Sequence, residues 1–258
     1  MSSTFASILV EDSPRGLAHV RLLTVNRPQV RNALDAHSAK ELTQAIAEAD
    51  HDSNISVLVL TGAGEHAFCA GADLSGIFSD ESTSLNGGVS ALGELLLQIR
   101  NCRIPIISAV NGIAVGGGFG IILASDLVVL SEKAKIGTPE IRRGLFAMFI
   151  ARFVYENLPE KIANEILFLG ETLTPQQALE LKIVNRVVPH DDLLTTALDM
   201  AKRIAAHSGS VLRLGKSAFH KQKDLPFDDA ISFLGAQLSE NLSLEDTQAG
   251  IKSFLKKD

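Results

Sequence analysis

The chain has 258 residues, of which 46% are hydrophobic, and it carries a net charge of −6 at pH 7. This length and composition allow one large folded domain, or one domain with an appendage. A net negative charge without a broad basic field argues against binding to nucleic acid, so no nucleic-acid partner is expected.

The N-terminal segment and the cysteines indicate the compartment. Residues 1–16 contain no basic region followed by a long apolar stretch, and no window approaches the roughly 18 apolar residues of a membrane span. Cys69 and Cys102 are too few for a disulfide framework or a structural zinc cluster, so we expect both thiols to be reduced and buried. These features predict a cytoplasmic protein with no membrane partner and no metal.

The first part of the chain alternates between strand and helix signals. Residues 17–25 are rich in β-forming side chains and stop before Pro28, which lacks the N–H that a strand ladder needs. Asp35 can cap a helix whose apolar residues follow helical spacing, and residues 57–60 form a wholly apolar strand. Strand, helix and strand in this order predict an α/β fold with crossover connections.

A loop, a helix and a second buried strand are expected next. Residues 77–88 are polar, acidic and rich in turn formers, which predicts a loop. Residues 89–99 predict a helix with one apolar face, and Glu94 lies off that face and is expected in solvent. Residues 106–110 are rich in Ile and Val and typical of a buried strand.

Three adjacent glycines, Gly116 to Gly118, open an apolar segment at residues 119–124 that is typical of a helix. Without Cβ atoms the backbone can approach a ligand closely, and the unpaired N–H groups of the first helical turn suit a phosphate or a developing oxyanion. A glycine-rich turn that serves only close packing is the alternative. The dinucleotide fingerprint fails, because Ile121 and Leu123 stand where its third glycine is required.

Four segments of the sequence form an ordered set of motifs. They are NRPQVRNAL (26–34), VLVLTGAGEHAFCAGADL (57–74), PIISAVNGIAVGGGFGIILASD (105–126) and GTPEIRRGL (137–145). In sequence, order and spacing they resemble the signature blocks of the enoyl-CoA hydratase/isomerase family, the crotonase superfamily. The resemblance implies an α/β fold, with a crotonase-type ββα spiral core and a helical C-terminal trimerisation region.

The resemblance also implies a division of the chain. Residues 1–195 are expected to form the spiral core with the CoA and acyl site, and residues 196–258 the oligomerisation region of a homotrimer or a dimer of trimers. Strand and helix signals beyond residue 140 agree with this division. Helices are predicted at 149–157, 191–207, 210–223, 228–242 and 243–257, after Pro159 and after Thr174, with Ser243 as the cap of the last. An interface between subunits is expected to include Phe233, Leu234, Leu238 and Phe254. The alternative is that these side chains pack inside the chain.

An acyl-CoA thioester is the substrate that the resemblance implies. Ala72 and Gly117 match the positions whose backbone N–H groups hold the thioester oxygen, and Glu140 matches a catalytic glutamate. Coenzyme A enters as part of the substrate, so no separate cofactor is expected. The positions matched to CoA and acyl binding are Arg27, Gln29, Arg31, Ala70, Gly71, Asp73, Leu74, Gly116, Gly118, Gly120, Pro139, Phe146 and Met148.

Each of these assignments has a structural alternative. Arg27 is expected to pair with a CoA phosphate, but it can equally brace a turn. The segment around Ala72 can be a tight turn capped by Asp73. Glu140 can be a surface glutamate that caps a turn or forms an ion pair.

Two positions depart from the hydratase pattern. Family hydratases carry a second glutamate where this chain has Gly120, and usually a glycine where it has Met148. The remaining arrangement resembles the single-glutamate Δ3,Δ2-enoyl-CoA isomerases, in which Glu140 would take a C2 proton and return it at C4. Surrounding apolar side chains can raise the pKa of Glu140 by desolvation. We expect Leu145, Phe146, Met148 and Phe149 to supply them, and Arg142 and Arg143 to face solvent or a CoA phosphate.

Other functions remain open at this point. An enoyl-CoA hydratase that uses a substitute second acid fits the same blocks. A non-catalytic acyl-CoA-binding protein also fits, because Gly120 can mark a lost active site. A peptidase with the spiral architecture fits poorly, because the sequence has no recognisable nucleophile elbow.

Overall fold

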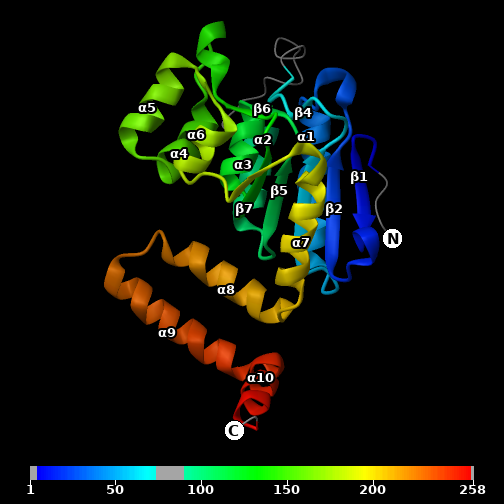
Figure 1. The fold of residues 1–258 in the computed structure, drawn as a ribbon. Coiled ribbons are helices and arrows are strands. Elements are labelled where there is room, and N and C mark those ends of the chain that lie inside the picture. The colour runs from blue at the N-terminus through cyan, green and yellow to red at the C-terminus, as the bar shows by residue number, and fades with distance from the viewer. Residues whose placement is uncertain (1–4, 74–89, 257–258) are drawn as a thin grey trace.

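The computed structural model describes residues 5–73 and 90–256, and its strands form two sheets (Figure 1). The strands are β1 (Ile8–Asp12), β2 (Val20–Val25), β3 (Val57–Gly62), β4 (Ala67–Cys69), β5 (Ile106–Val110), β6 (Ile113–Val115), β7 (Leu127–Ser131), β8 (Lys135–Gly137), β9 (Thr172–Leu173) and β10 (Arg186–Val188).

Helices connect these strands and cover the sheets. They are α1 (Ala36–His51), α2 (Ala91–Asn101), α3 (Gly117–Ala124), α4 (Met148–Asn157), α5 (Glu160–Leu169), α6 (Pro175–Glu180), α7 (Leu193–Ala205), α8 (Gly209–Gln222), α9 (Phe227–Ser243) and α10 (Glu245–Leu255). Single turns of 3-10 helix occur at η1 (Pro14–Gly16), η2 (Pro28–Val30), η4 (Pro139–Arg143) and η5 (His190–Asp192).

The chain winds between the two sheets as a spiral. The larger sheet has the order β1-β2-β3-β5-β7-β10 and the smaller sheet the order β4-β6-β8-β9. Neighbouring strands are parallel except in the pairs β1–β2 and β8–β9. Along the chain β3, β5 and β7 are each followed by a strand of the smaller sheet, and α2 and α3 lead back to the larger one. This repeat confirms the predicted ββα spiral.

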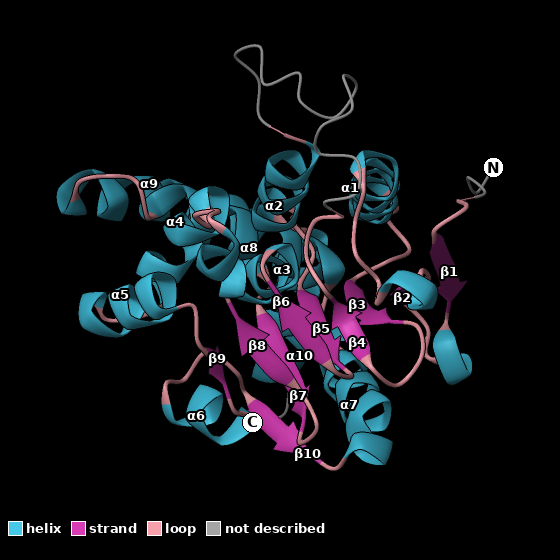
Figure 2. Cartoon of the chain, turned by 90° about the horizontal axis from the view of Figure 1, so that it is seen from above, coloured by secondary structure: helices cyan, strands magenta, loops and turns pink. Residues whose placement is uncertain are grey.

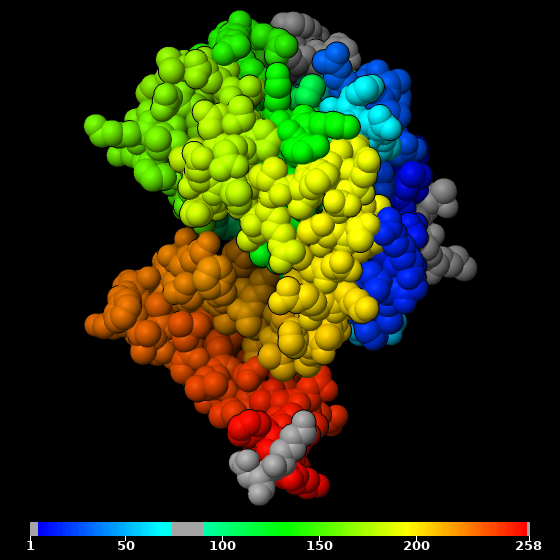
Figure 3. All heavy atoms as spheres, viewed as in Figure 1, coloured from blue at the N-terminus to red at the C-terminus, as the bar shows by residue number. Residues whose placement is uncertain are grey.

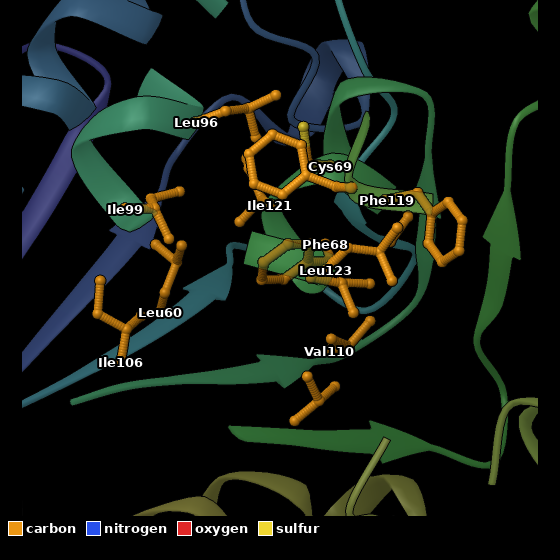
Figure 4. Close-up of a cluster of buried hydrophobic side chains, with 14 of the residues drawn as sticks. Leu60, Phe68, Cys69, Leu96, Ile99, Ile106, Val110, Phe119, Ile121 and Leu123 are labelled. Carbon is orange, nitrogen blue, oxygen red and sulfur yellow. The ribbon is translucent and has the colours of Figure 1, made fainter. Parts of the chain in front are cut away.

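β3 shows why the strands of the larger sheet are apolar on both faces. Leu58 and Leu60 point into a core cluster shared with the smaller sheet and α1 to α3, whereas Val57 and Val59 point into a second cluster under α7. Side chains of a strand alternate between faces, so a strand covered on both sides is apolar throughout. Figure 4 shows the first cluster, with Leu60 beside Ile99 of α2.

Local capping signals place two of the helices as predicted. α1 begins after Asp35, whose carboxylate accepts the Ser38 N–H at 2.8 Å, while the Asp35 N–H donates back to the Ser38 hydroxyl at 3.0 Å. Thr174 caps α6 with the same reciprocal pattern. The cap predicted at Ser243 is wrong, because this residue ends α9, where its hydroxyl donates to the Glu240 carbonyl oxygen.

The boundary predicted between residues 195 and 196 is wrong, because it falls inside α7. This helix buries Leu193, Ala197 and Leu198 in the cluster on the outer face of the larger sheet, so it belongs to the core. The part that extends away from the core is α8 to α10, drawn in orange and red in Figure 1 and Figure 3.

Polar side chains hold α8 against the core. The Arg213 guanidinium is 17% exposed and donates to the carbonyl oxygens of Asp52 and Ile55, each at 2.7 Å. One turn further along, Lys216 Nζ pairs with the Asp126 carboxylate at 2.5 Å. These contacts fix where the C-terminal helices leave the spiral.

Two predictions about the whole chain can be compared with the structure. Cys69 and Cys102 are free and buried, as predicted, and burial raises the pKa of each thiol to about 12. Within residues 5–73 and 90–256, no helix has both the length and the apolar character needed to cross a membrane.

Replacing Arg213 should weaken the fold. We expect Arg213→Ala to lower the free energy of unfolding by about 2–4 kcal/mol, because it leaves carbonyl oxygens without their charged donor. Arg152→Ala is the control, since Arg152 is 67% exposed and only 3.9 Å from Glu156, and should cost less than about 0.5 kcal/mol. Urea unfolding measures both values, and equal losses would contradict the anchoring role.

Candidate functional site

The candidate site lies where three strands of the smaller sheet end. β4, β6 and β8 are parallel neighbours, with Cys69 opposite Ala114 and Val115 opposite Gly137. The carboxyl ends of parallel strands meet at one edge of a sheet, so the segments that follow them lie side by side (Figure 2). A hydrogen bond of 2.9 Å from the Gly116 N–H to the Gly137 carbonyl oxygen joins two of these segments. The fold thus brings the three predicted site segments together.

Glycines allow these segments to touch through their backbones. Gly71 has a φ of +93°, and a Cβ on it would lie 2.9 Å from the Val115 carbonyl oxygen and 3.3 Å from the Gly117 nitrogen. A Cβ on Gly118 would overlap the Cys69 carbonyl oxygen. Close packing therefore explains Gly118, and the same packing presses the segment after β4 against the start of α3.

Two backbone N–H groups at this junction are left as donors. Gly117 is the first residue of α3, and the first N–H groups of a helix have no partner within it. Ala72 stands in an isolated bridge in which the Leu34 N–H donates to Gly71 and the Asp73 N–H donates to Leu34, each at 2.8 Å. The Ala72 N–H has no backbone acceptor among the described residues. Both donors sit beside the Gly71–Gly117 contact, as an oxyanion site requires.

Glu140 places its carboxylate against the same junction. It follows Pro139 in η4, and its Oε1 lies 2.6 Å from where a Cβ on Gly116 would stand. Its Oε2 is buried and has no hydrogen-bond partner among the residues that the structure describes. Burial raises the pKa of Glu140, and the nearby positive charge of Arg143 opposes part of that rise. A carboxylate with a raised pKa, held against the Gly116 backbone at this junction, is suited to moving a proton.

Most of the side chains predicted to surround Glu140 are exposed. Met148 is 71% exposed, Phe149 41% and Leu145 38%, so they cannot be the main cause of its desolvation. Phe146 does pack against the core, with its ring centroid 6.3 Å from that of Phe168. Met148 is the first residue of α4, and its place beside the substrate stays a prediction. Its neighbours Arg142 and Arg143 are exposed, as expected.

Position 120 offers no acid, and apolar side chains lie close to where a side chain there would start. A Cβ on Gly120 would lie 3.2 Å from Ile150 Cγ1 and 3.3 Å from both terminal carbons of Leu96. The departure from the hydratase pattern at Gly120 is therefore matched by apolar packing around it.

Arg27 forms polar contacts with residues next to the site. Its guanidinium donates to the Ala33 carbonyl oxygen at 2.5 Å and pairs with the carboxylates of Asp35 at 2.8 Å and Asp73 at 3.5 Å. Its side chain is 16% exposed. These contacts match the bracing alternative for Arg27 and give Asp73 an ion-pair role, so pairing of Arg27 with a CoA phosphate is not supported.

The remaining predicted contacts border the site or lie outside the described part. Gln29 and Arg31 are exposed, and the Arg31 carbonyl oxygen accepts the Ala70 N–H at 3.1 Å, which joins this turn to the segment after β4. Leu74 and the loop predicted at residues 77–88 lie outside the described residues.

Sequence reasoning missed two buried asparagines that orient β4. Asn32 Nδ2 donates to the Ala67 carbonyl oxygen at 2.7 Å, and Asn111 Nδ2 donates to that of Gly64 at 2.7 Å. Both asparagines lie inside signature segments of the sequence, and that location could have identified them as site residues. Leu92 of α2 was also not predicted as a site residue. In the structure, a Cβ on Gly117 would lie only 3.0 Å from its side chain.

A family model described as Enoyl-CoA hydratase/isomerase matches residues 15–258. The chain belongs to the enoyl-CoA hydratase/isomerase family. Enoyl-CoA hydratase domain-containing protein 3, mitochondrial, of Rattus norvegicus is 32% identical over 239 residues, which cover 92% of this chain and 79% of the relative. Short-chain-enoyl-CoA hydratase of Clostridium acetobutylicum is 30% identical over 245 residues and 92% of each chain.

The solved structures agree with the family. The crystal structure of human enoyl-CoA hydratase domain-containing protein 3 superposes with a TM-score of 0.90 at 28% identity, covering 97% of this chain and 98% of the other. The fold is therefore the crotonase fold, and the chain is an acyl-CoA enzyme of this family, an isomerase or a hydratase.

Adding a side chain at position 116 should disable the enzyme. Gly116→Ala would put a methyl group against Glu140 Oε1, and displacing that carboxylate by about 1 Å should lower turnover of enoyl-CoA thioesters by roughly 10²-fold. Gly144→Ala is the matched control, because Gly144 also has a positive φ (+76°) but a Cβ there meets nothing within 4 Å. Turnover and thermal unfolding of both variants separate backbone strain from loss of the carboxylate position, and similar turnover in the two would contradict the contact.

Proposed function

We propose that this enzyme isomerises the double bond of enoyl-CoA thioesters, with Glu140 as the single proton shuttle. The observation that carries the proposal is the buried Oε2 of Glu140, which has no hydrogen-bond partner among the described residues, in a side chain held against Gly116 at the start of α3. A carboxylate with a raised pKa is a stronger base than an ordinary glutamate, and its conjugate acid can still return the proton.

The proposed reaction starts with the thioester oxygen. The N–H groups of Ala72 and Gly117 would hold that oxygen and stabilise negative charge as it develops, and losing one such donor typically costs ~2.7–4 kcal/mol of transition-state stabilisation. Glu140 would take a proton from C2 of a 3-enoyl-CoA, which gives a dienolate with its charge on the held oxygen. The same carboxyl group would then protonate C4, so the double bond moves to C2–C3 with no net gain or loss of atoms.

Hydration is the second candidate. The Clostridium acetobutylicum relative is named a short-chain-enoyl-CoA hydratase, which favours this reaction by similarity. Hydration needs a group that positions or deprotonates water in addition to Glu140, and the position that supplies it in family hydratases is Gly120. The apolar contacts of Ile150 and Leu96 at that position favour isomerisation.

The proposal also includes the oligomeric state of the protein and its location in the cell. A homotrimer or dimer of trimers would cover the apolar side chains that α8 to α10 expose, which include Phe227 at 78% and Phe254 at 71%. Exposure of Phe254 agrees with its predicted place at an interface. A cytoplasmic location remains a prediction, and the rat relative is named mitochondrial.

The isotope experiment decides between the two reactions. Purified protein is incubated with 2-enoyl-CoA or 3-enoyl-CoA thioesters of several chain lengths in heavy-oxygen water, and the products are read by mass spectrometry. We expect interconversion of the isomers without heavy oxygen, and a loss of roughly 10²–10⁴-fold in Glu140→Gln, which cannot accept the proton.

The other results have distinct meanings. Heavy oxygen in a 3-hydroxyacyl product would establish a hydratase and overturn the proposed isomerisation. A protein that binds acyl-CoA equally well before and after Glu140→Gln, with no turnover in either form, would be a non-catalytic binding protein.

The pH dependence should respond to Arg143. Because Glu140 must be ionised to accept the C2 proton, the rate falls as the pH drops through its raised pKa. Arg143 lowers that pKa by its positive charge, so Arg143→Gln should shift the acid limb of kcat/KM to higher pH. Arg142→Gln is the control, since Arg142 is equally exposed but exerts no resolved effect on Glu140. An unchanged acid limb in Arg143→Gln would contradict Glu140 as the base.

A further inference from the structure

Position 120 lies one turn along α3 from Gly116, the residue that Glu140 approaches. The Gly120 N–H donates to the Gly116 carbonyl oxygen at 3.0 Å, so the two residues lie one helical turn apart on the same face. Side chains of a helix lean towards its N-terminus. A side chain at position 120 would therefore point back towards Gly116, whose own Cβ position is next to Glu140 Oε1.

Two apolar side chains occupy the space that such a side chain would need. Ile150 of α4 and Leu96 of α2 approach the Cβ position of Gly120 to 3.2 and 3.3 Å, and they are 4% and 1% exposed. Both belong to the main core cluster, and α3 packs against α2 and α4 (Figure 2). Figure 4 shows Leu96 among the labelled core side chains. We call Leu96 and Ile150 the apolar plug.

The apolar plug would keep water away from the Glu140 carboxylate on the side of Gly120. An ordered water needs two to four polar partners and room for its own volume. On the side of Gly120 the plug offers neither, since it presents only methyl and methylene groups within 3.2–3.3 Å of the Gly120 Cβ position. In the proposed reaction, Glu140 would then transfer its proton only to a carbon atom of the substrate.

We propose that Leu96 and Ile150 determine the reaction, by filling the place of the second hydratase acid and excluding water from Glu140. This inference rests on the proposed isomerase function. Hydration would add the water oxygen to C3 and a proton to C2, so it requires a water molecule held close to Glu140. Isomerisation moves one proton from C2 to C4 and requires no such molecule. The same carboxylate therefore serves one reaction and not the other because of the two apolar side chains at position 120.

The first test replaces the plug by an acid. In the double variant Gly120→Glu with Ile150→Ala, the carboxylate takes the volume that Ile150 leaves. Gly120→Gln with Ile150→Ala is the control, because glutamine fills the same space without acid or base chemistry. In heavy-oxygen water, the ratio of heavy-oxygen product to isomerised product should rise at least about tenfold over both the wild type and the glutamine control.

The second test needs no turnover. Ile150→Thr and Ile150→Val have the same shape, but threonine brings a hydroxyl to the face that touches Gly120. Titration of the Glu140 carboxyl by carbon NMR, assigned with Glu140→Gln, should give a lower pKa in the threonine variant than in the valine variant, because the hydroxyl and its water stabilise the ionised form. These substitutions also keep the test valid if the double variant does not fold.

The outcomes separate this inference from the proposed function. If the wild type isomerises and the folded double variant gains no heavy oxygen, or if threonine and valine variants titrate alike, the plug has no role and the isomerase function stands. If the wild type is inert towards all thioesters but the pKa difference is present, the proposed function and the choice of reaction by the plug both fail, and only the exclusion of water from Glu140 remains. Heavy oxygen in the wild-type product would overturn both.

Discussion

The site depends on one steric constraint, the contact between backbones at the carboxyl ends of β4, β6 and β8. Gly71 and Gly116 have positive φ values, and a Cβ on either would strike the neighbouring segment or Glu140. Only residues without side chains satisfy both the backbone conformation and the contact. Because the segments touch, the free N–H of Gly117 and the carboxylate of Glu140 come to the same place. The candidate site of this protein therefore depends on the absence of side chains at Gly71 and Gly116.

Burial of Glu140 links function to a loss of stability. Its pKa is raised in the folded state, so the folded protein binds this proton more tightly than the unfolded chain does. The stability that this group contributes is present below its unfolded pKa and is lost as the pH rises through the folded pKa. The ionised form, which the proposed reaction needs as its base, is therefore the form that the fold tolerates less well. The large core between the sheets compensates for this local cost.

The apolar packing of Leu96 and Ile150 at Gly120 has two consequences. It contributes to the core that holds α2, α3 and α4 together, and it leaves the position of the second hydratase acid without space. A change from glutamate to Gly120 alone would leave a cavity, which costs stability. Leu96 and Ile150 fill that volume, so this region has the packing of an intact protein core. This argues against a decayed hydratase site.

The sequence by itself determined the features that depend on neighbours along the chain. Asp35 and Thr174 cap their helices through bonds to residues three positions away, and the alternation on β3 follows from its own side chains. The ordered motifs likewise identified the family, the glycine junction and Glu140. Only the tertiary structure decided what Arg27 binds, where Met148 points and what fills the space at Gly120. Those outcomes depend on contacts between segments far apart in the chain, and no local pattern specifies which side chains will meet there.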